Sequence, residues 1–125
     1  MTKHILQITV IVTLGDPASA TYTYTDPNTN NLVRNSPTFD MQLSHRTCCL
    51  FVLDATSSKN GWTITQILPN RTNEIDYEMG PYNLSVGTLF KNSPNTDYRF
   101  FILYYNFMTQ ETRFCDPQEV NIPIK

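Results

Sequence analysis

The sequence predicts an all-β protein, specifically an antiparallel β-sandwich with an immunoglobulin-like outline. Three observations favour this fold class. Alternating apolar and polar residues recur at strand-like spacing, no segment of useful length has the 3.6-residue period of a helix, and aromatic residues are abundant, with seven Tyr and seven Phe. A chain of 125 residues is expected to form one domain, residues 1–125, around a single core.

The first half of the chain begins with the clearest strand patterns. Residues 4–14 and 21–25 alternate strictly, with apolar residues or tyrosines on one face. Residues 32–34 predict a short strand after a polar loop. Residues 39–44 alternate once more and place Asp40 on the outward or cleft-facing side.

Further strands are expected in the second half. Residues 48–53 are almost continuously apolar, as in a central sandwich strand, residues 57–61 form a turn, and residues 62–68 alternate. Residues 84–90 form a moderate strand in which Gly87 indicates a bulge or a close backbone approach.

The most apolar and aromatic stretch lies near the C-terminal end. Residues 98–117 are expected to form a β-hairpin that runs through the core and stops at Asp116-Pro117. Residues 119–125 suit an edge strand, because an edge tolerates Pro123.

Composition and charge exclude several classes of partner. Only 16% of the residues are charged and the formal net charge is −2, so no nucleic-acid binding is expected. No apolar run is long enough to cross a bilayer, so no membrane partner is expected. The first twenty residues share features with a secretory signal, but polar residues at alternate positions indicate a strand. A cytoplasmic location is therefore expected, with secretion as the alternative.

The cysteines indicate neither a disulfide framework nor a metal site. There are three, Cys48 and Cys49 are adjacent, and no C-x-x-C spacing occurs. We expect three reduced thiols that pack as small apolar side chains, and neither a cofactor nor a bound metal.

Candidate chemistry comes from three Asp-Pro bonds, at residues 16–17, 26–27 and 116–117. In this linkage the Asp carboxyl can attack its own main-chain carbonyl, and the proline nitrogen is a protonatable leaving group. A fold accelerates the reaction by holding the carboxyl against the carbonyl and by burying it. Asp16 and Asp26 read as ordinary turn residues. Asp116 follows an apolar run where desolvation is expected, although it also reads as a simple strand terminator.

The segments HILQITVIVTL, TYTYTDPN and FCDPQEVNIP resemble the DP-EP family of small bacterial β-proteins. The resemblance implies an aspartic-type peptidase that cleaves itself at the Asp116-Pro117 bond. It implies that Asp116 is the acting carboxyl, Pro117 the leaving side and Gln118 a positioning residue. The protein's own C-terminal segment would be the substrate, and the tail Pro117–Lys125 would be released.

The same resemblance implies a supporting tyrosine in the second strand and a supporting Asp in the first half. Tyr24 and Asp40 are the nearest candidates, and Asp26 can replace Asp40. Two carboxyls held close together have their pKa values pushed apart, so that one can donate a proton while the other stays ionised. Cys115 beside the bond has no histidine tied to it by a motif, and we expect it to belong to the core.

The rival hypothesis is a non-enzymatic sandwich module that forms homo-oligomers or binds a ligand through aromatic sheet faces. Asp116-Pro117 would then only end a strand. The aromatic residues considered for such a face, most of which are expected in the core, are Tyr82, Tyr98, Tyr104, Tyr105 and Trp62.

Overall fold

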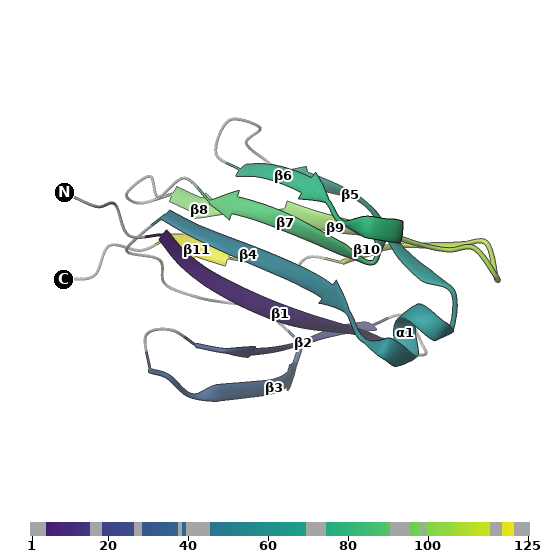
Figure 1. Cartoon of the computed structure of the whole chain (residues 1–125), viewed down its shortest axis with the longest axis horizontal. Helices are drawn as coiled ribbons and strands as arrows, with labels where there is room; N and C mark the ends of the chain where they lie inside the picture. The colour runs from purple at the N-terminus through teal and green to yellow at the C-terminus, as the bar shows by residue number, and fades with distance from the viewer. Residues whose placement is uncertain are drawn as a thin grey trace.

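The protein is an all-β sandwich in which two sheets pack against each other, as the sequence predicts (Figure 1). The computed structural model describes residues 5–15, 19–26, 29–37, 39, 46–69, 75–90, 96–98, 100–115 and 119–121. Absences and counts below refer to these residues only.

The larger sheet has six strands in the order β3-β2-β1-β4-β7-β6. They are β1 (Ile5–Gly15), β2 (Ser19–Thr25), β3 (Leu32–Ser36), β4 (Arg46–Leu53), β6 (Ile75–Met79) and β7 (Ser85–Phe90). Neighbouring strands are antiparallel except for β1 and β4, which pair in parallel from Ile5 opposite Arg46 to Val12 opposite Leu53. β3 runs in the same direction as β1 and ends opposite Tyr22, whereas β4 begins opposite Ile5 at the other end of β1, so no hairpin joins β4 to the strands before it. The expected immunoglobulin-like strand order is not confirmed.

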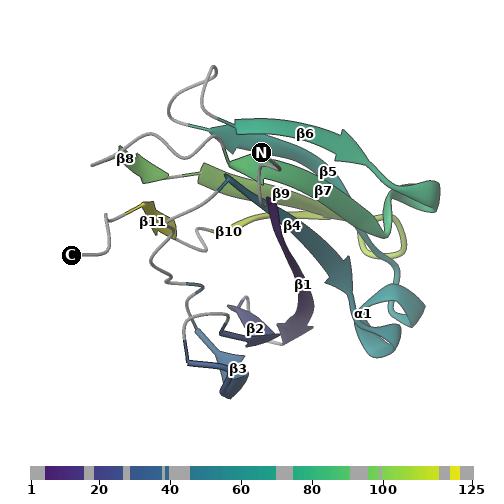
Figure 2. The same cartoon turned by 60° about the vertical axis from the view of Figure 1, so that its left-hand side comes forward.

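The second layer has three strands in the order β10-β9-β5. They are β5 (Trp62–Pro69), β9 (Phe100–Asn106) and β10 (Glu111–Cys115). β9 and β10 form the hairpin that the sequence predicts, and Figure 2 shows them above β1 and β2.

The hairpin continues into a second ladder between β8 (Thr96–Tyr98) and β11 (Glu119–Asn121). Ile102 pairs with Cys115, and Tyr98 pairs with Glu119. Three residues separate the two pairs on each arm, so the register is the same in both ladders. The edge strand expected in the tail is therefore confirmed for residues 119–121.

Two short helical segments connect the strands. α1 (Ala55–Lys59) replaces the turn expected at this position, because Asp54 caps the helix by accepting a hydrogen bond from the Ser57 N–H at 2.8 Å. η1 (Pro81–Asn83) follows β6, a strand that the sequence analysis does not assign.

The core lies between the layers and takes alternate side chains from each strand. The largest completely or almost completely buried side chains are Tyr22, Tyr104, Phe39, Phe51, Phe100, Ile64, Ile67 and Ile102. Trp62 and Tyr104 belong to this core, which excludes them from an exposed aromatic face. A bulge between Ile64 and Gln66 shifts β5 by one residue and turns Ile67 inward.

Gly87 does not mark the bulge or close approach that the sequence suggested. It pairs with Leu50 and with Glu78 in uninterrupted ladders, and a Cβ atom there would meet only the Glu78 carbonyl, at 3.9 Å. The missing side chain leaves a hollow on the outer face of the large sheet instead.

Candidate functional site

The expected cleavage site falls in a part of the chain that the structure does not describe. Asp116, Pro117 and Gln118 lie outside the described residues, and so does Asp40. Cys115, which is bonded to Asp116, and the supporting candidates Tyr24 and Asp26 are described.

Cys115 ends β10 and lies half-buried against the core. Burial raises the pKa of its thiol, although the nearby Arg113 guanidinium acts in the opposite direction. The thiol is therefore a neutral core group, as expected from the sequence. The residue bonded to Asp116 thus sits in a partly dry environment at the edge of the sandwich interior.

Tyr104 is a second member of this environment that the sequence analysis did not assign to the site. It points inward from β9 and is completely buried. Burial raises the pKa of its hydroxyl well above the ordinary value, and the nearby Tyr22 and Cys115 side chains act in the same direction. The interior beside Cys115 therefore contains a phenol that stays protonated.

Arg113, which pairs with Tyr104 across the β9–β10 ladder, joins the two layers. Its Nη1 donates a hydrogen bond to the Gly15 carbonyl at 2.6 Å, and its Nε donates to Glu111 Oε2 at 2.7 Å. The guanidinium carbon also lies 4.3 Å from the centre of the Trp62 ring. The Glu111 carboxylate, the Gly15 carbonyl and the Trp62 ring compensate the positive charge of the guanidinium. Arg113 therefore docks β10 onto the end of β1.

These contacts show how β10 runs over β2. Arg113 reaches Gly15, which pairs with the first residue of β2, whereas Cys115 lies near the Tyr104 ring that also approaches Tyr22. The next inward residue of β2 after Tyr22 is Tyr24.

Tyr24 lies in the interior and not on an open surface. Its ring meets Phe39 edge to face, with 4.7 Å between the ring centres, and Phe39 continues the contact to Phe51. The structure thus brings Tyr24 to the residue that precedes Asp40. Asp26 lies two residues beyond Tyr24, where its carbonyl accepts a hydrogen bond from the Asn30 N–H at 2.7 Å.

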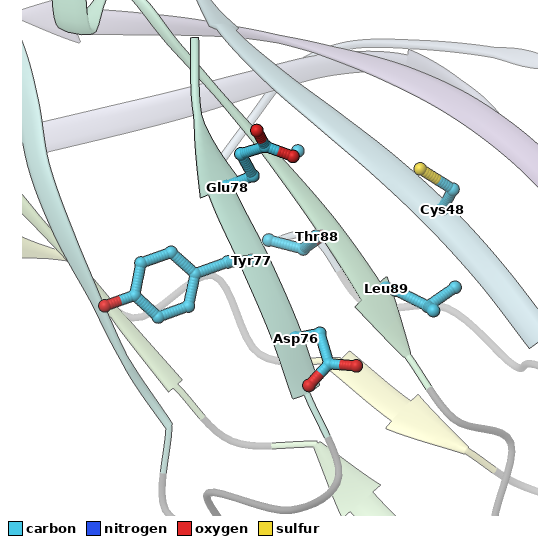
Figure 3. A pocket seen from close by; sticks show the side chains of 7 residues that line it. Cys48, Asp76, Tyr77, Glu78, Thr88 and Leu89 are labelled. Carbon is cyan, nitrogen blue, oxygen red and sulfur yellow. The ribbon is translucent and has the colours of Figure 1, made fainter.

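A separate hollow lies on the outer face of the large sheet (Figure 3). It has a volume of about 280 Å³, and Asp76, Glu78, Leu89 and Cys48 surround it while Tyr77 and Thr88 point away. The hollow is open to water and has an acidic flank on β6. Among the described residues that line it, none is a lysine, arginine or histidine that could lower the pKa of a thiol.

In the part of the chain that the structure describes, no group of three or more His, Cys, Asp and Glu residues is placed to hold a metal ion. None of its helices is long and apolar enough to cross a membrane.

No protein-family model matches the chain, and a search of curated proteins gives no significant match.

Proposed function

We propose that the protein is an aspartic-type peptidase that cleaves its own Asp116-Pro117 bond. The observation that carries the proposal is the position of Cys115, because the residue bonded to Asp116 is half-buried beside the Tyr104 phenol. Partial desolvation favours attack by a carboxyl group on a neighbouring carbonyl, since it removes competing water and strengthens local electrostatics.

The reaction consumes one water molecule. A carboxylate oxygen of Asp116 attacks the carbonyl carbon of the same residue and closes a cyclic anhydride, while the nitrogen of Pro117 takes a proton and leaves. Water then opens the anhydride and restores the Asp116 side chain. A second carboxyl, from Asp40 or Asp26, supplies the proton, and Tyr24 supports this group from β2.

Intact mass measured over days at mildly acidic pH tests the proposal. The parent chain is expected to lose Pro117–Lys125, and Asp116→Ala is expected to remain whole. The same incubation in concentrated urea is the control for intrinsic lability, because an unfolded chain has no reason to prefer one of its three Asp-Pro bonds. Equal cleavage of all three bonds in the folded protein would refute a role for the fold.

Two variants then identify the second carboxyl. Asp40→Ala and Asp26→Ala are compared under the same conditions, and the one that supplies the proton is expected to slow cleavage at least tenfold. A parental rate in either variant removes that residue from the mechanism.

A second candidate function, self-association, is favoured by the outer face of β9–β10. This face comprises Phe101, Leu103 and Tyr105 on β9 and Thr112 and Phe114 on β10, none of which is charged. The exposed fractions are 45% for Phe101, 37% for Tyr105 and 62% for Phe114. At about 200 Å² per aromatic side chain, the three rings expose on the order of 300 Å². That area matches the apolar centre of a dimer interface that buries about 800 Å² per partner.

Sedimentation tests this second candidate. The parent is expected to reach twice the monomer mass at micromolar concentration, and Phe114→Lys is expected to be monomeric, because the substitution buries an unpaired charge in the interface. Tyr82→Asn is the matched control, since Tyr82 is 89% exposed on η1 and is not one of the residues of this face. A monomeric parent would exclude self-association through this face.

A further inference from the structure

The outer edge of β10 lacks the features that keep the other sheet edges from pairing. β10 is the last strand of the small sheet, and among the described strands it pairs with β9 alone. An unpaired edge strand is a template for a further strand, and proteins commonly block such an edge with bulges, prolines or charges.

The other edge strands of the two described sheets carry these blocking features. β3 has a register irregularity opposite β2 and contains Asn35, whose φ is 50°. β5 has the bulge described above and ends at Pro69, and β6 presents the exposed carboxylates Asp76 and Glu78. The ladder of β10 with β9, in contrast, is regular from its first residue to its last. β10 is therefore the edge that is best suited to accept another strand.

Hydrogen bonds of β9 show which of its residues face β10. The Tyr105 carbonyl accepts a hydrogen bond from the Thr63 hydroxyl of β5 at 2.8 Å, so Tyr105 directs its backbone groups toward β5. The Asn106 carbonyl accepts one from the Gln110 N–H at 2.7 Å in the β9–β10 turn, so Asn106 directs its groups toward β10. Successive residues of a strand alternate in this respect.

The free backbone groups of β10 follow from this alternation. Thr112 pairs with Tyr105 and Phe114 pairs with Leu103, both of which face β5. In an antiparallel ladder such pairs exchange no hydrogen bond, and each residue directs its N–H and C=O to the opposite side. The N–H and C=O groups of Thr112 and Phe114 therefore point to the outer edge of β10.

Space for a further strand lies beside these groups. A hollow of about 300 Å³ is lined by the consecutive residues Glu111–Cys115 of β10 and by no other described strand. Side chains of these residues alternate between the two faces of the sheet. A hollow bordered by both faces of a single strand lies along the edge of that strand.

The charges of β10 do not prevent pairing. Thr112 and Phe114, which point away from the core, are both exposed and uncharged. The inward Arg113 is bound by the Glu111 carboxylate at 2.7 Å and by the Gly15 carbonyl. The guanidinium charge is thus compensated within one chain.

We infer that β10 pairs antiparallel with β10 of a second copy of this chain, about a two-fold axis through Arg113. The axis places Thr112 opposite the partner's Phe114, and Phe114 opposite the partner's Thr112. Each of these pairs exchanges both of its N–H···O bonds, so all the edge groups of the two residues are satisfied. The two small sheets thereby join into one.

A second copy is favoured over an unrelated strand because the edge is complementary to itself. Each outward pair combines a β-branched and an aromatic side chain, a favourable cross-strand combination. The axis brings the two Arg113 residues together, and the Glu111 carboxylate bound to each guanidinium offsets their repulsion. This pairing is independent of self-cleavage, and it uses the strand edge instead of the outer face of β9–β10.

Amide hydrogen exchange, followed by NMR at increasing protein concentration, tests the inference. The Thr112 and Phe114 amides are expected to exchange rapidly in the dilute monomer. Their exchange should slow about tenfold once about nine-tenths of the chains are paired, because only unpaired chains then exchange. The Arg113 and Cys115 amides are internal controls, since they face β9 and should be protected at every concentration.

Two variants separate the edge from the outer face. Thr112→Pro removes an N–H from the edge and no hydrogen bond to β9, and proline is tolerated on edge strands. It is expected to raise the dissociation constant of the dimer, measured by sedimentation, by at least about tenfold. Phe101→Lys is the matched control, because it adds a charge to the outer face on β9 and leaves the edge of β10 intact, and it should keep the parental constant.

Several outcomes would overturn the inference. A parent that stays monomeric at about 1 mM, where even weak complexes form, excludes the pairing. Thr112 and Phe114 amides that are protected at every concentration would show that the same chain covers the edge, and amides that exchange rapidly in the dimer would place its interface elsewhere. A dimer lost in Phe101→Lys and kept in Thr112→Pro would assign association to the outer face.

Thermal melting shows whether Thr112→Pro folds. If it does not, the concentration dependence of the Thr112 and Phe114 amides in the parent decides alone. None of these results bears on self-cleavage, which intact mass tests separately.

Discussion

The Asp54 carboxylate links the start of helix α1 to strand β1. One carboxylate oxygen accepts a hydrogen bond from the Ser57 N–H at the start of α1, and the other accepts one from the Thr13 hydroxyl of β1 at 2.7 Å. The Ser57 hydroxyl in turn accepts a hydrogen bond from the Leu14 N–H at 2.9 Å. The end of β1 is thereby fastened to the helix that follows β4.

Substitution of Asp54 is expected to reduce stability in a pH-dependent way. Partial burial alone would raise the pKa of Asp54, but the hydrogen bonds from Ser57 and Thr13 hold it below its ordinary value of 3.8. A lowered pKa in the folded state stabilises the fold above that ordinary value, and the contribution is lost as the pH falls through the folded pKa. Asp54→Ala should cost about 1–2 kcal/mol at pH 7 in urea unfolding.

The control for this prediction is Asp54→Asn, which keeps a good helix cap but does not titrate. It should retain most of the stability at pH 7 and lose the part of the pH dependence that comes from residue 54. An unchanged pH dependence in Asp54→Asn would contradict the assignment.

At the scale of single residues, the sequence predicted which side chains point inward but not what they meet. Tyr24 is inward because β2 alternates, and this was visible in the sequence. The buried placement of Arg113 was obscured, because a charged residue between Thr112 and Phe114 does not look apolar. Its burial depends on Gly15 and Trp62, which are distant in sequence and were not predicted to be its neighbours.

Among the elements, the segment that follows α1 packs closely against the β9–β10 turn. Gly61 has a φ of 98°, and its carbonyl accepts a hydrogen bond from the Phe107 N–H at 3.1 Å. The buried Asn106 side chain donates to the Asn60 carbonyl at 3.0 Å and accepts from the Met108 N–H at 2.9 Å. The β9–β10 turn is therefore held in place by residues 60 and 61, which lie just before β5.

Gly61→Ala is expected to destabilise the protein by about 2 kcal/mol or more, because its φ is unfavourable for other residues and space is lacking. An added Cβ would lie 2.6 Å from Asn106 Oδ1 and 2.7 Å from Met108 Cγ. Gly87→Ala is the matched control, since its nearest contact would be 3.9 Å away, and it should be neutral or slightly stabilising. Thermal melting of both variants checks the prediction, and equal losses would contradict it.

The sequence predicted most strands because alternation is a local property. β6 was missed because only Ile75 of its five residues is buried, so it carries little apolar signal. α1 was missed because five residues are too few to show a helical period. The parallel pairing of β1 with β4 depends on how distant segments meet, which no local pattern contains.

For the molecule as a whole, the C-terminal tail contributes little to the described contacts. β11 pairs only with β8 among the described strands, over three residues. A chain that ends at Asp116, which represents the proposed cleavage product, is therefore expected to remain folded. Its unfolding free energy should fall by about 1–3 kcal/mol, the worth of a few backbone hydrogen bonds.

Urea unfolding of this shortened chain beside the parent checks that expectation. The separate nonapeptide of residues 117–125 should not bind the shortened chain at micromolar concentration, because an isolated three-residue ladder is marginal. Tight binding, or a shortened chain that is unfolded at 25 °C, would show that the tail is an integral part of the sandwich.

Fold class was accessible from the sequence as a whole, whereas the candidate site was accessible only in part. Cys115 was expected to belong to the core and packs against it half-buried, whereas Tyr24 was expected only as a supporting tyrosine of the second strand and is buried. Tyr104 was recognised only as one aromatic among several. Its complete burial depends on how the two sheets pack, which no local pattern contains.

The parallel ladder between β1 and β4 also constrains how a newly synthesised chain acquires its shape. When β1 emerges from the ribosome, it has no neighbouring strand on the β4 side of the sheet until residue 53 has been synthesised. Folding is expected to be slow, because the entropy of closing this long loop is lost before the contacts between β1 and β4 form. We expect it to take place on the millisecond-to-second scale typical of non-local β-proteins. During that interval the first strand is the segment most in need of protection by a chaperone.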